Sequence, residues 1–131
     1  MSATSLESFQ RQVSELLLRH RSILDILSKC DQAGASVHRS VIKAVTECGC
    51  IRVDAGKQAY PPDLTLEQAR GVLSTHVSGS LCDTCKEIIS DQLGKQLFYT
   101  ASLCNVLNID LDRVIADESS KCSALGVFKM A

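Results

Sequence analysis

Residues 82–107, which read CDTCKEIISDQLGKQLFYTASLCNVL, are the longest uninterrupted helical pattern in the chain. Apolar side chains recur there at steps of three and four residues, which is typical of a helix with one broad apolar face. The residues of that face are Cys85, Ile88 or Ile89, Leu93, Leu97, Tyr99, Thr100, Leu103, Cys104 and Leu107. We therefore predict a central helix at about 82–107 in an all-α protein.

The sequence before this helix predicts two more helices. The same apolar spacing indicates a helix at about 5–28 and a second at about 37–55. Between them, residues 28–36 contain Asp31, Gly34 and several small polar residues, which break the pattern and supply possible N-caps. We expect the chain to turn there.

An irregular connector at residues 56–80 follows. Its start, from Tyr60 to Asp63, contains two consecutive prolines, which exclude a helix and favour an extended or turn conformation. Thr65 and Gln68 then fit a capping box, which predicts a short helix at about 66–76.

Composition favours a single helical domain over residues 1–131. Two prolines and no tryptophan in 131 residues leave little material for a turn-rich β fold. Beyond the central helix, Asp110 is a good N-cap for a last helix at about 111–122. The predicted fold class is therefore all-α.

Charge and hydropathy limit the partners and the location. With 14 basic and 15 acidic side chains, the chain has no excess of positive charge that would favour binding to nucleic acid or an anionic membrane. No apolar run has the length of a membrane span, and the first ten residues lack the features of a signal peptide, so we expect a cytoplasmic protein. The cysteines are odd in number, and we interpret them as thiols. They are Cys30, Cys48, Cys50, Cys82, Cys85, Cys104 and Cys122.

Two segments resemble the MazG-like nucleotide pyrophosphohydrolases. Residues 91–111, DQLGKQLFYTASLCNVLNIDL, are similar without a gap to the family's third-helix pattern, E-E-L-G-D-x-L-F-Y followed by N-x-L-x-I-D-L. Upstream, residues 46–51, TECGCI, resemble the second-helix motif E-E-x-G-E-L. The two matches occur in the family's order, and the resemblance covers about residues 37–120.

This resemblance implies an antiparallel four-helix-type bundle that assembles with itself as a homodimer or tetramer. In active members, acids of E-x-x-E and E-x-x-D share a face and hold Mg²⁺ against a triphosphate. The corresponding positions here are Glu47, Cys50, Gln92 and Lys95, and only Glu47 is a carboxylate. Mg²⁺ prefers oxygen ligands, so the resemblance implies a degenerate metal site whose activity is lost or altered.

Two further arrangements of charged residues remain open. Lys95 would either pair with Glu47 in the place of the metal or extend into solvent. A relocated acidic site at Glu47, Glu87 and Asp91 would keep the enzyme active, whereas solvated carboxylates near a helix N-terminus are the more common situation.

The cysteines raise the possibility of zinc. Cys48, Cys50, Cys82 and Cys85 would supply four thiolates. If the two family motifs face each other across antiparallel helices, however, the two cysteine pairs lie roughly 10–20 Å apart at about 1.5 Å per residue. Four ligands of one ion cannot span that distance unless a non-helical start before Cys85 folds back. We therefore predict no shared four-cysteine site, and a two-ligand metal site at Cys82 and Cys85, shared across an oligomer interface, remains an alternative.

Three functions are consistent with these patterns. We favour a non-catalytic MazG-like module that binds a nucleotide or has a regulatory role, with no cofactor. The first alternative is an active nucleoside triphosphate pyrophosphohydrolase that uses Mg²⁺. The second is a cysteine-based protein that binds zinc or senses redox state. The sequence assigns no catalytic residue.

Overall fold

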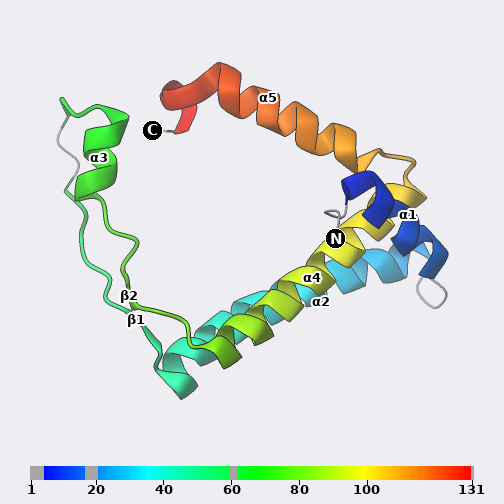
Figure 1. Ribbon diagram of the computed structural model, residues 1–131, viewed down its shortest axis with the longest axis horizontal. Coiled ribbons are helices and arrows are strands. Elements are labelled where there is room, and N and C mark those ends of the chain that lie inside the picture. Colours follow the sequence, from blue (N-terminus) through cyan, green and yellow to red (C-terminus); the bar gives the residue numbers. More distant parts are fainter. Residues whose placement is uncertain (1–4, 17–20, 60–61, 131) are drawn as a thin grey trace.

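The computed structural model describes residues 5–16, 21–59 and 62–130. Helix dominates this part of the chain, which confirms the predicted all-α class (Figure 1). The elements in chain order are α1 (Leu6–Leu16), α2 (Ile23–Lys43), the π-helical turn η1 (Ala44–Cys48), β1 (Ile51–Val53), α3 (Leu66–Val72), β2 (Val77–Gly79), α4 (Asp83–Val106) and α5 (Leu111–Met130). Within the described ranges, no helix is both long enough and apolar enough to cross a membrane.

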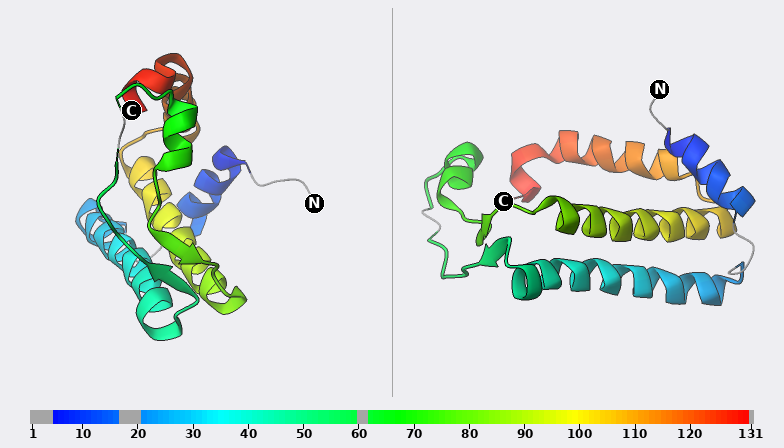
Figure 2. Two further views of the ribbon diagram at one scale, coloured as in Figure 1. Left: turned by 90° about the vertical axis from the view of Figure 1, so that its left-hand side faces the viewer. Right: turned by 60° about the horizontal axis from the view of Figure 1, so that its bottom comes forward.

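The two long helices α2 and α4 lie side by side in opposite directions and form the body of the molecule (Figures 1 and 2). Near one end of this pair, the Cys30 thiol donates to the Tyr99 carbonyl oxygen at 3.5 Å. At the other end, Cys48 lies beside Cys82. The register therefore places residue 30 close to residue 99, and residue 48 close to residue 82. We call this pair the α2–α4 hairpin.

Helix α1 packs against the last turns of α4 and the start of α5, and we call this region the α1 end. Gln10 ties the three helices together. Its Nε2 donates to the Ile109 carbonyl at 2.8 Å, and its Oε1 accepts from the Leu111 N–H at 2.9 Å. Its backbone carbonyl accepts from Asn105 Nδ2 at 3.1 Å. The buried core residues here are Val13, Ala101, Cys104 and Leu111, with Leu6, Phe9 and Phe98 packed around them.

The opposite end of the hairpin, which we call the cysteine end, carries a small antiparallel sheet. Strand β1 pairs with β2 so that Ile51 lies opposite Gly79 and Val53 lies opposite Val77. Ile51 is buried with Ala44 and Ile89 in a second, smaller core. Helix α3 lies beyond the strands, away from the hairpin (Figure 1).

The predicted turn at residues 28–36 was wrong, because α2 continues through them. The single predicted helix at 5–28 was wrong as well, since a new helix, α2, begins at Ile23 after its N-cap Ser22. Ala33 is buried, and a Cβ placed on Gly34 would lie 3.6 Å from the amide nitrogen of Gln96. Packing against α4 therefore holds this stretch helical despite its polar residues, because tertiary contacts override weak intrinsic propensity.

The prediction that the second helix continues to residue 55 was also wrong. The helix ends at Gly49, which adopts a left-handed conformation with φ of 78°, and residues 51–53 form β1. A left-handed residue terminates a helix and redirects the chain.

Three other boundaries were predicted more closely. The capping box is confirmed, since Thr65 Oγ1 accepts from the Gln68 N–H at 3.2 Å and Gln68 Oε1 accepts from the Thr65 N–H at 3.1 Å. The short helix is shorter than predicted, because Leu73 is extended and α3 ends at Val72 and not near residue 76. Helix α4 matches the predicted 82–107 within one residue at each end. Helix α5 begins where predicted but is longer than 111–122. The expectation for Tyr60 and Pro61 lies outside the described residues.

Candidate metal centre

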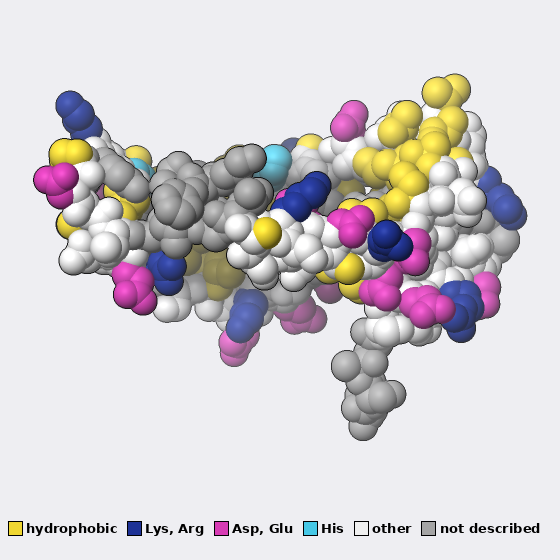
Figure 3. Space-filling view, turned by 90° about the horizontal axis from the view of Figure 1, so that it is seen from above, with side chains coloured by type: hydrophobic (Ala, Val, Ile, Leu, Met, Phe, Trp, Pro, Cys, Tyr) yellow, Lys and Arg dark blue, Asp and Glu magenta, His cyan; other side chains and the backbone are white. Residues whose placement is uncertain are grey.

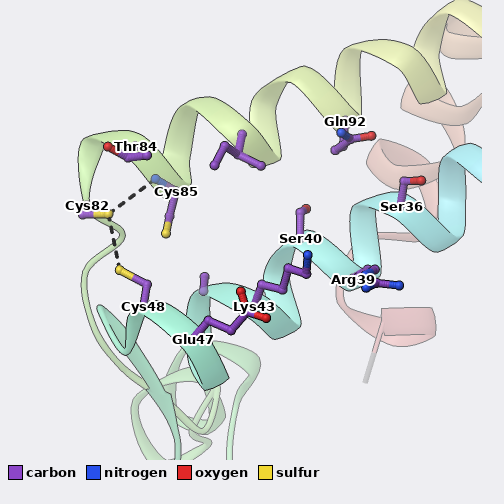
Figure 4. Close-up of a pocket in the computed structure, with 12 residues that line it drawn as sticks. Ser36, Arg39, Ser40, Lys43, Glu47, Cys48, Cys82, Thr84, Cys85 and Gln92 are labelled. Atoms are coloured by element: carbon purple, nitrogen blue, oxygen red, sulfur yellow. Dashed lines mark hydrogen bonds between the residues drawn. The ribbon is translucent and has the colours of Figure 1, made fainter.

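Four cysteines meet at the cysteine end. The sulfur atoms of Cys48, Cys50, Cys82 and Cys85 all lie within 4.8 Å of one another. The Cys48 and Cys82 sulfurs are 3.8 Å apart. Figure 4 shows the sulfurs of Cys48, Cys82 and Cys85 pointing toward one another between η1 and the start of α4. In the part of the chain that the structure describes, this is the one group of three or more potential protein ligands.

The first cysteine pair is positioned by the end of η1. The Gly49 N–H donates to the Ala44 carbonyl at 2.8 Å, which closes the wide last turn. Cys48 is the final residue of that turn, and Cys50 follows the left-handed Gly49. The Cys50 thiol contacts the same Ala44 carbonyl at 3.9 Å. The change of direction at Gly49 thus brings two cysteines, separated by one residue, to the same side.

The second pair is positioned by the start of α4. Cys82 is the N-cap, and its sulfur accepts from the Cys85 N–H at 3.4 Å. Cysteines three residues apart in the first turn lie on the same helix face. Strand β2 leads into this turn through Gly79, which has φ of 84°.

Gly79 also allows the two pairs to come close. A Cβ on Gly79 would lie 2.5 Å from the carbonyl oxygen of Cys50, which is too close for any other residue. The sheet register places Gly79 opposite Ile51, directly after Cys50. The short sheet therefore brings the chain before α4 against the chain after η1.

The thiols of the cluster differ in acidity. The backbone N–H of Cys85 donates to Cys82 and, with the thiol of Cys85, lowers the pKa of Cys82 to about 7. The interaction with Cys82 in turn raises the pKa of Cys85 to about 12. A helix N-terminus favours a thiolate for the same reason that it favours other anions. In the metal-free chain, Cys82 is therefore the first of these two thiols to ionise.

The geometry and chemistry of the four sulfurs fit a tetrahedral metal ion. Zinc binds thiolates at about 2.3 Å, so two ligands of a regular ZnS₄ tetrahedron are about 3.8 Å apart. The Cys48–Cys82 separation of 3.8 Å equals that edge. Soft thiolates select zinc or iron over magnesium or calcium. Four cysteine ligands also fill the coordination sphere and leave no position for a substrate, as in structural zinc sites.

The structure corrects the expectation that the two cysteine pairs are too far apart. That expectation assumed that residues 47–50 face residues 92–95. In the structure, Cys48 is instead next to Cys82, and residue 34 faces residue 96. The true register is therefore shifted by about three turns of helix.

The four positions carried over from the MazG-like pattern are distributed over three places. Glu47 and Gln92 line a cavity of about 710 Å³ beside the cysteines. Cys50 belongs to the sulfur cluster. Lys95 is exposed and lines a neighbouring groove, which Gln92 also lines. Among the ion pairs of the described residues, none joins Glu47 to Lys95, so the pairing hypothesis is not supported.

The carboxylates of the relocated acidic site are not brought together either. In the part of the chain described, Glu47, Glu87 and Asp91 do not form a group that would hold a metal. Around a helix of 3.6 residues per turn, Asp91 is rotated by about 100° and Glu87 by about 140° from Gln92, the residue of α4 that lines the cavity with Glu47.

The cavity contains residues that the sequence did not indicate. Arg39 and Lys43 line it from α2, and Thr84 lines it from α4 (Figure 4). Arg39 and Lys43 are four residues apart and therefore share a helix face, but i, i+4 basic pairs are too common on exposed helices to signal a site from sequence. Gly79 was missed for a different reason, because only the paired strands create its close contact with Cys50.

No protein-family model, curated protein or solved structure matches this chain. The function is therefore inferred from the geometry of the site.

Proposed function

We propose that this chain is a zinc-binding helical protein whose tetrathiolate centre is formed by Cys48, Cys50, Cys82 and Cys85. The observation that carries the proposal is the convergence of four sulfurs within 4.8 Å from two segments more than 30 residues apart in sequence. All seven cysteines are free thiols, which suits a reducing compartment such as the cytoplasm.

The zinc ion has a structural role. A closed S₄ site has no open coordination position, so the metal does not activate water or polarise a substrate. It joins the end of η1 to the start of α4 and closes the cysteine end of the hairpin. Binding requires four deprotonated thiols, and it therefore couples metal affinity to folding and to pH.

The surroundings favour a bound metal with thiolate ligands. Zinc with four thiolates carries a net charge of about −2, and burial of such a charge is favoured by nearby cations. Lys43 and Arg39 line the cavity that also exposes Cys48, Cys82 and Cys85. Both basic residues come from α2, and their side-chain nitrogens lie farther along the cavity from the sulfurs (Figure 4).

Cobalt substitution tests the proposal. We expect metal-free protein, titrated with Co²⁺ under anaerobic reducing conditions, to bind one ion and to develop the thiolate charge-transfer and tetrahedral d–d absorption of a CoS₄ site. Zinc should displace the cobalt stoichiometrically. Changing any one cluster cysteine, for example Cys85→Ser, should weaken binding at least about tenfold, whereas the exposed Cys122→Ser should bind as the parent does. Equal binding by the parent and a variant without the four cysteines would refute the proposal.

A second candidate function is the binding of an anionic small molecule, such as a nucleotide, in the adjacent cavity of a MazG-like bundle. The observation in its favour is that Glu47 and Gln92, two of the carried-over positions, line the same cavity as Arg39 and Lys43. A cavity of about 710 Å³ is within the size range of small-molecule sites. Three of the four acidic positions of the MazG-like pattern are not acidic here, and Arg39 and Lys43 add positive charge to the cavity. Both features would favour binding of a phosphate group without Mg²⁺.

Calorimetric titration with nucleoside triphosphates in the absence of divalent ions tests this candidate. Binding that Lys43→Glu abolishes, with zinc content unchanged, would support it. Pyrophosphate release that depends on Mg²⁺ or Mn²⁺ would instead support the active enzyme. No binding and no turnover by zinc-loaded protein would remove both possibilities and leave the zinc proposal unaffected.

A further inference from the structure

The four cysteines of the metal centre divide into an inner and an outer pair. Among the described residues, Cys50 and Cys85 pack against the second, smaller core at the cysteine end. Cys48 and Cys82 are not part of that packing, and Cys48 is exposed. We call Cys48 and Cys82 the outer pair.

The outer pair lies at the wall of the cavity beside the cluster. Both of its residues line this space of about 710 Å³, as does Cys85 from the inner pair. Cys50 does not line it, and its thiol contacts the Ala44 carbonyl at 3.9 Å. The cavity is much larger than the roughly 30 Å³ that a water molecule occupies in the liquid. An oxidant as small as hydrogen peroxide therefore reaches the outer sulfurs.

The two outer sulfurs are already in contact. They are 3.8 Å apart, and Figure 4 draws this contact as a dashed line. The bond length of a disulfide is about 2.0 Å, so the sulfurs need to approach by only about 1.8 Å. Cys48 ends η1 and Cys82 caps α4. A bond between them would therefore hold these two segments together in the absence of a metal.

We propose that a hydroperoxide oxidises Cys48 and Cys82 to a disulfide and thereby releases the zinc ion, so that the metal centre is a reversible redox switch. This inference rests on the proposed zinc-binding function. It adds a regulation of the same site, in which a covalent bond replaces the metal between the end of η1 and the start of α4.

The reaction balances with hydrogen peroxide as the oxidant. Zinc holds its cysteine ligands as thiolates. The exposed Cys48 thiolate attacks one peroxide oxygen, which breaks the O–O bond, forms a sulfenic acid and releases a hydroxide ion. The Cys82 thiolate then attacks the Cys48 sulfur and displaces a second hydroxide as the disulfide forms. The two thiolates lose two electrons, and these reduce the peroxide to two hydroxide ions.

Loss of the outer pair leaves zinc with two protein ligands. Changes in the partners around metal ligands alone weaken metal binding by about 10–100-fold. Removal of two direct ligands should therefore weaken zinc binding by more than about a hundredfold, which is enough for a chelator to take the ion.

Cys104 provides an internal reference for the oxidation. It is 8% exposed and is buried with Val13 and Leu111 at the α1 end, where Figure 3 shows hydrophobic side chains gathered. The susceptibility of a thiol to oxidation follows its thiolate character and its exposure. Cys104 should therefore stay reduced at a peroxide concentration that oxidises the outer pair.

Peroxide treatment of the zinc-loaded, full-length chain tests the proposal. A chromogenic chelator follows the zinc, and differential alkylation before and after reduction identifies the cysteines that the bond joins. We expect release of one zinc ion per chain with loss of two thiols, at Cys48 and Cys82, while Cys50 and Cys85 stay reduced. A thiol reductant together with zinc should restore the original metal content.

Cys122→Ser is the matched control, because Cys122 is exposed but lies outside the cluster; this variant should release zinc as the parent does. A bond between Cys82 and Cys85 in place of the Cys48–Cys82 bond would overturn the proposal, as would zinc that stays bound. Zinc content measured before oxidation tests the proposed function separately. A chain that takes up zinc but forms no Cys48–Cys82 bond overturns only the redox switch, whereas a chain that takes up no zinc overturns both.

Discussion

The α1 end and the cysteine end close the same helical hairpin with different chemistry. At the α1 end, side chains from three helices bury Val13 and Leu111, and Gln10 satisfies backbone groups between them. Among the described residues, the buried cluster at the cysteine end consists of Ala44, Ile51 and Ile89, and four thiols lie beside it. A large buried apolar side chain contributes roughly 1.5–3 kcal/mol. A zinc ion of the kind proposed would supply, at the cysteine end, stability that buried apolar side chains supply at the α1 end.

Removal of the metal should produce the largest difference in stability between the two ends. A chelator, or Cys85→Ser, should lower the melting temperature by at least about 15 °C, since structural zinc supplies much of the folding free energy of small sites. Hydrogen exchange should show early loss of protection at η1, β1, β2 and the first turn of α4. The α1 end should keep its protection. Equal loss at both ends would mean that the hairpin unfolds as one unit.

Removing part of the apolar core should act on the other end alone. Val13→Ala should reduce the free energy of unfolding by about 2–3 kcal/mol, because Val13 is 2% exposed and its methyl groups leave a cavity. Denaturant unfolding measures the change, and zinc stoichiometry should stay the same. Leu16→Ala, 69% exposed on the same helix, is the control and should change stability by less than about 0.5 kcal/mol. A fall in zinc content in Val13→Ala would contradict the view that the two ends are stabilised independently.

Substitution of Gly79 in the small sheet should reduce both stability and zinc affinity. Gly79→Ala should cost about 1–2 kcal/mol from the left-handed backbone alone, and contact with the Cys50 carbonyl should weaken zinc binding as well. Competition with a chromogenic chelator measures the affinity. Gly71→Ala in α3 is the control, because its Cβ would meet nothing within 4 Å. Undiminished zinc affinity in Gly79→Ala would show that the sheet does not position Cys50.

The acidity of Cys82 should produce the smallest effect, a difference in reactivity. In metal-free protein the alkylation rate of Cys82 should rise with a midpoint near pH 7, because the Cys85 N–H stabilises its thiolate. The folded pKa is below the ordinary 9.0, so this thiolate stabilises the folded apo chain fully above pH 9 and loses its contribution as the pH falls through 7. Peptide mapping after timed alkylation gives the rates, with exposed Cys122 as the internal reference. A midpoint near 9 would contradict the N-cap geometry.

Sequence periodicity predicted the elements whose signals are local. The central helix has a long apolar pattern, and Thr65, Gln68 and Asp110 make their capping interactions with backbone groups two or three residues away. Such contacts need no knowledge of the tertiary fold. These local signals therefore located the start of α3, both ends of α4 and the start of α5.

The errors came from features that depend on distant contacts. Ala33 and Gly34 stay helical because α4 packs against them, and the three-residue strand at Ile51 exists because β2 pairs with it. The four-cysteine site was rejected because the register of α2 and α4 was inferred from a family pattern and not from packing. The four cysteines were recognised as zinc ligands by type, but their meeting depends on the turn at Gly49 and on the close approach at Gly79.

Native mass spectrometry of the freshly purified, reduced full-length chain tests the central claim most directly. A tetrathiolate centre predicts one zinc ion per chain, with a mass increase reduced by the mass of the displaced thiol protons. The ion should be absent when Cys48 and Cys82 are both changed to serine and present in Cys122→Ser. A parent chain that carries no metal after reconstitution with zinc, while all four cluster cysteines remain reduced, would contradict the account.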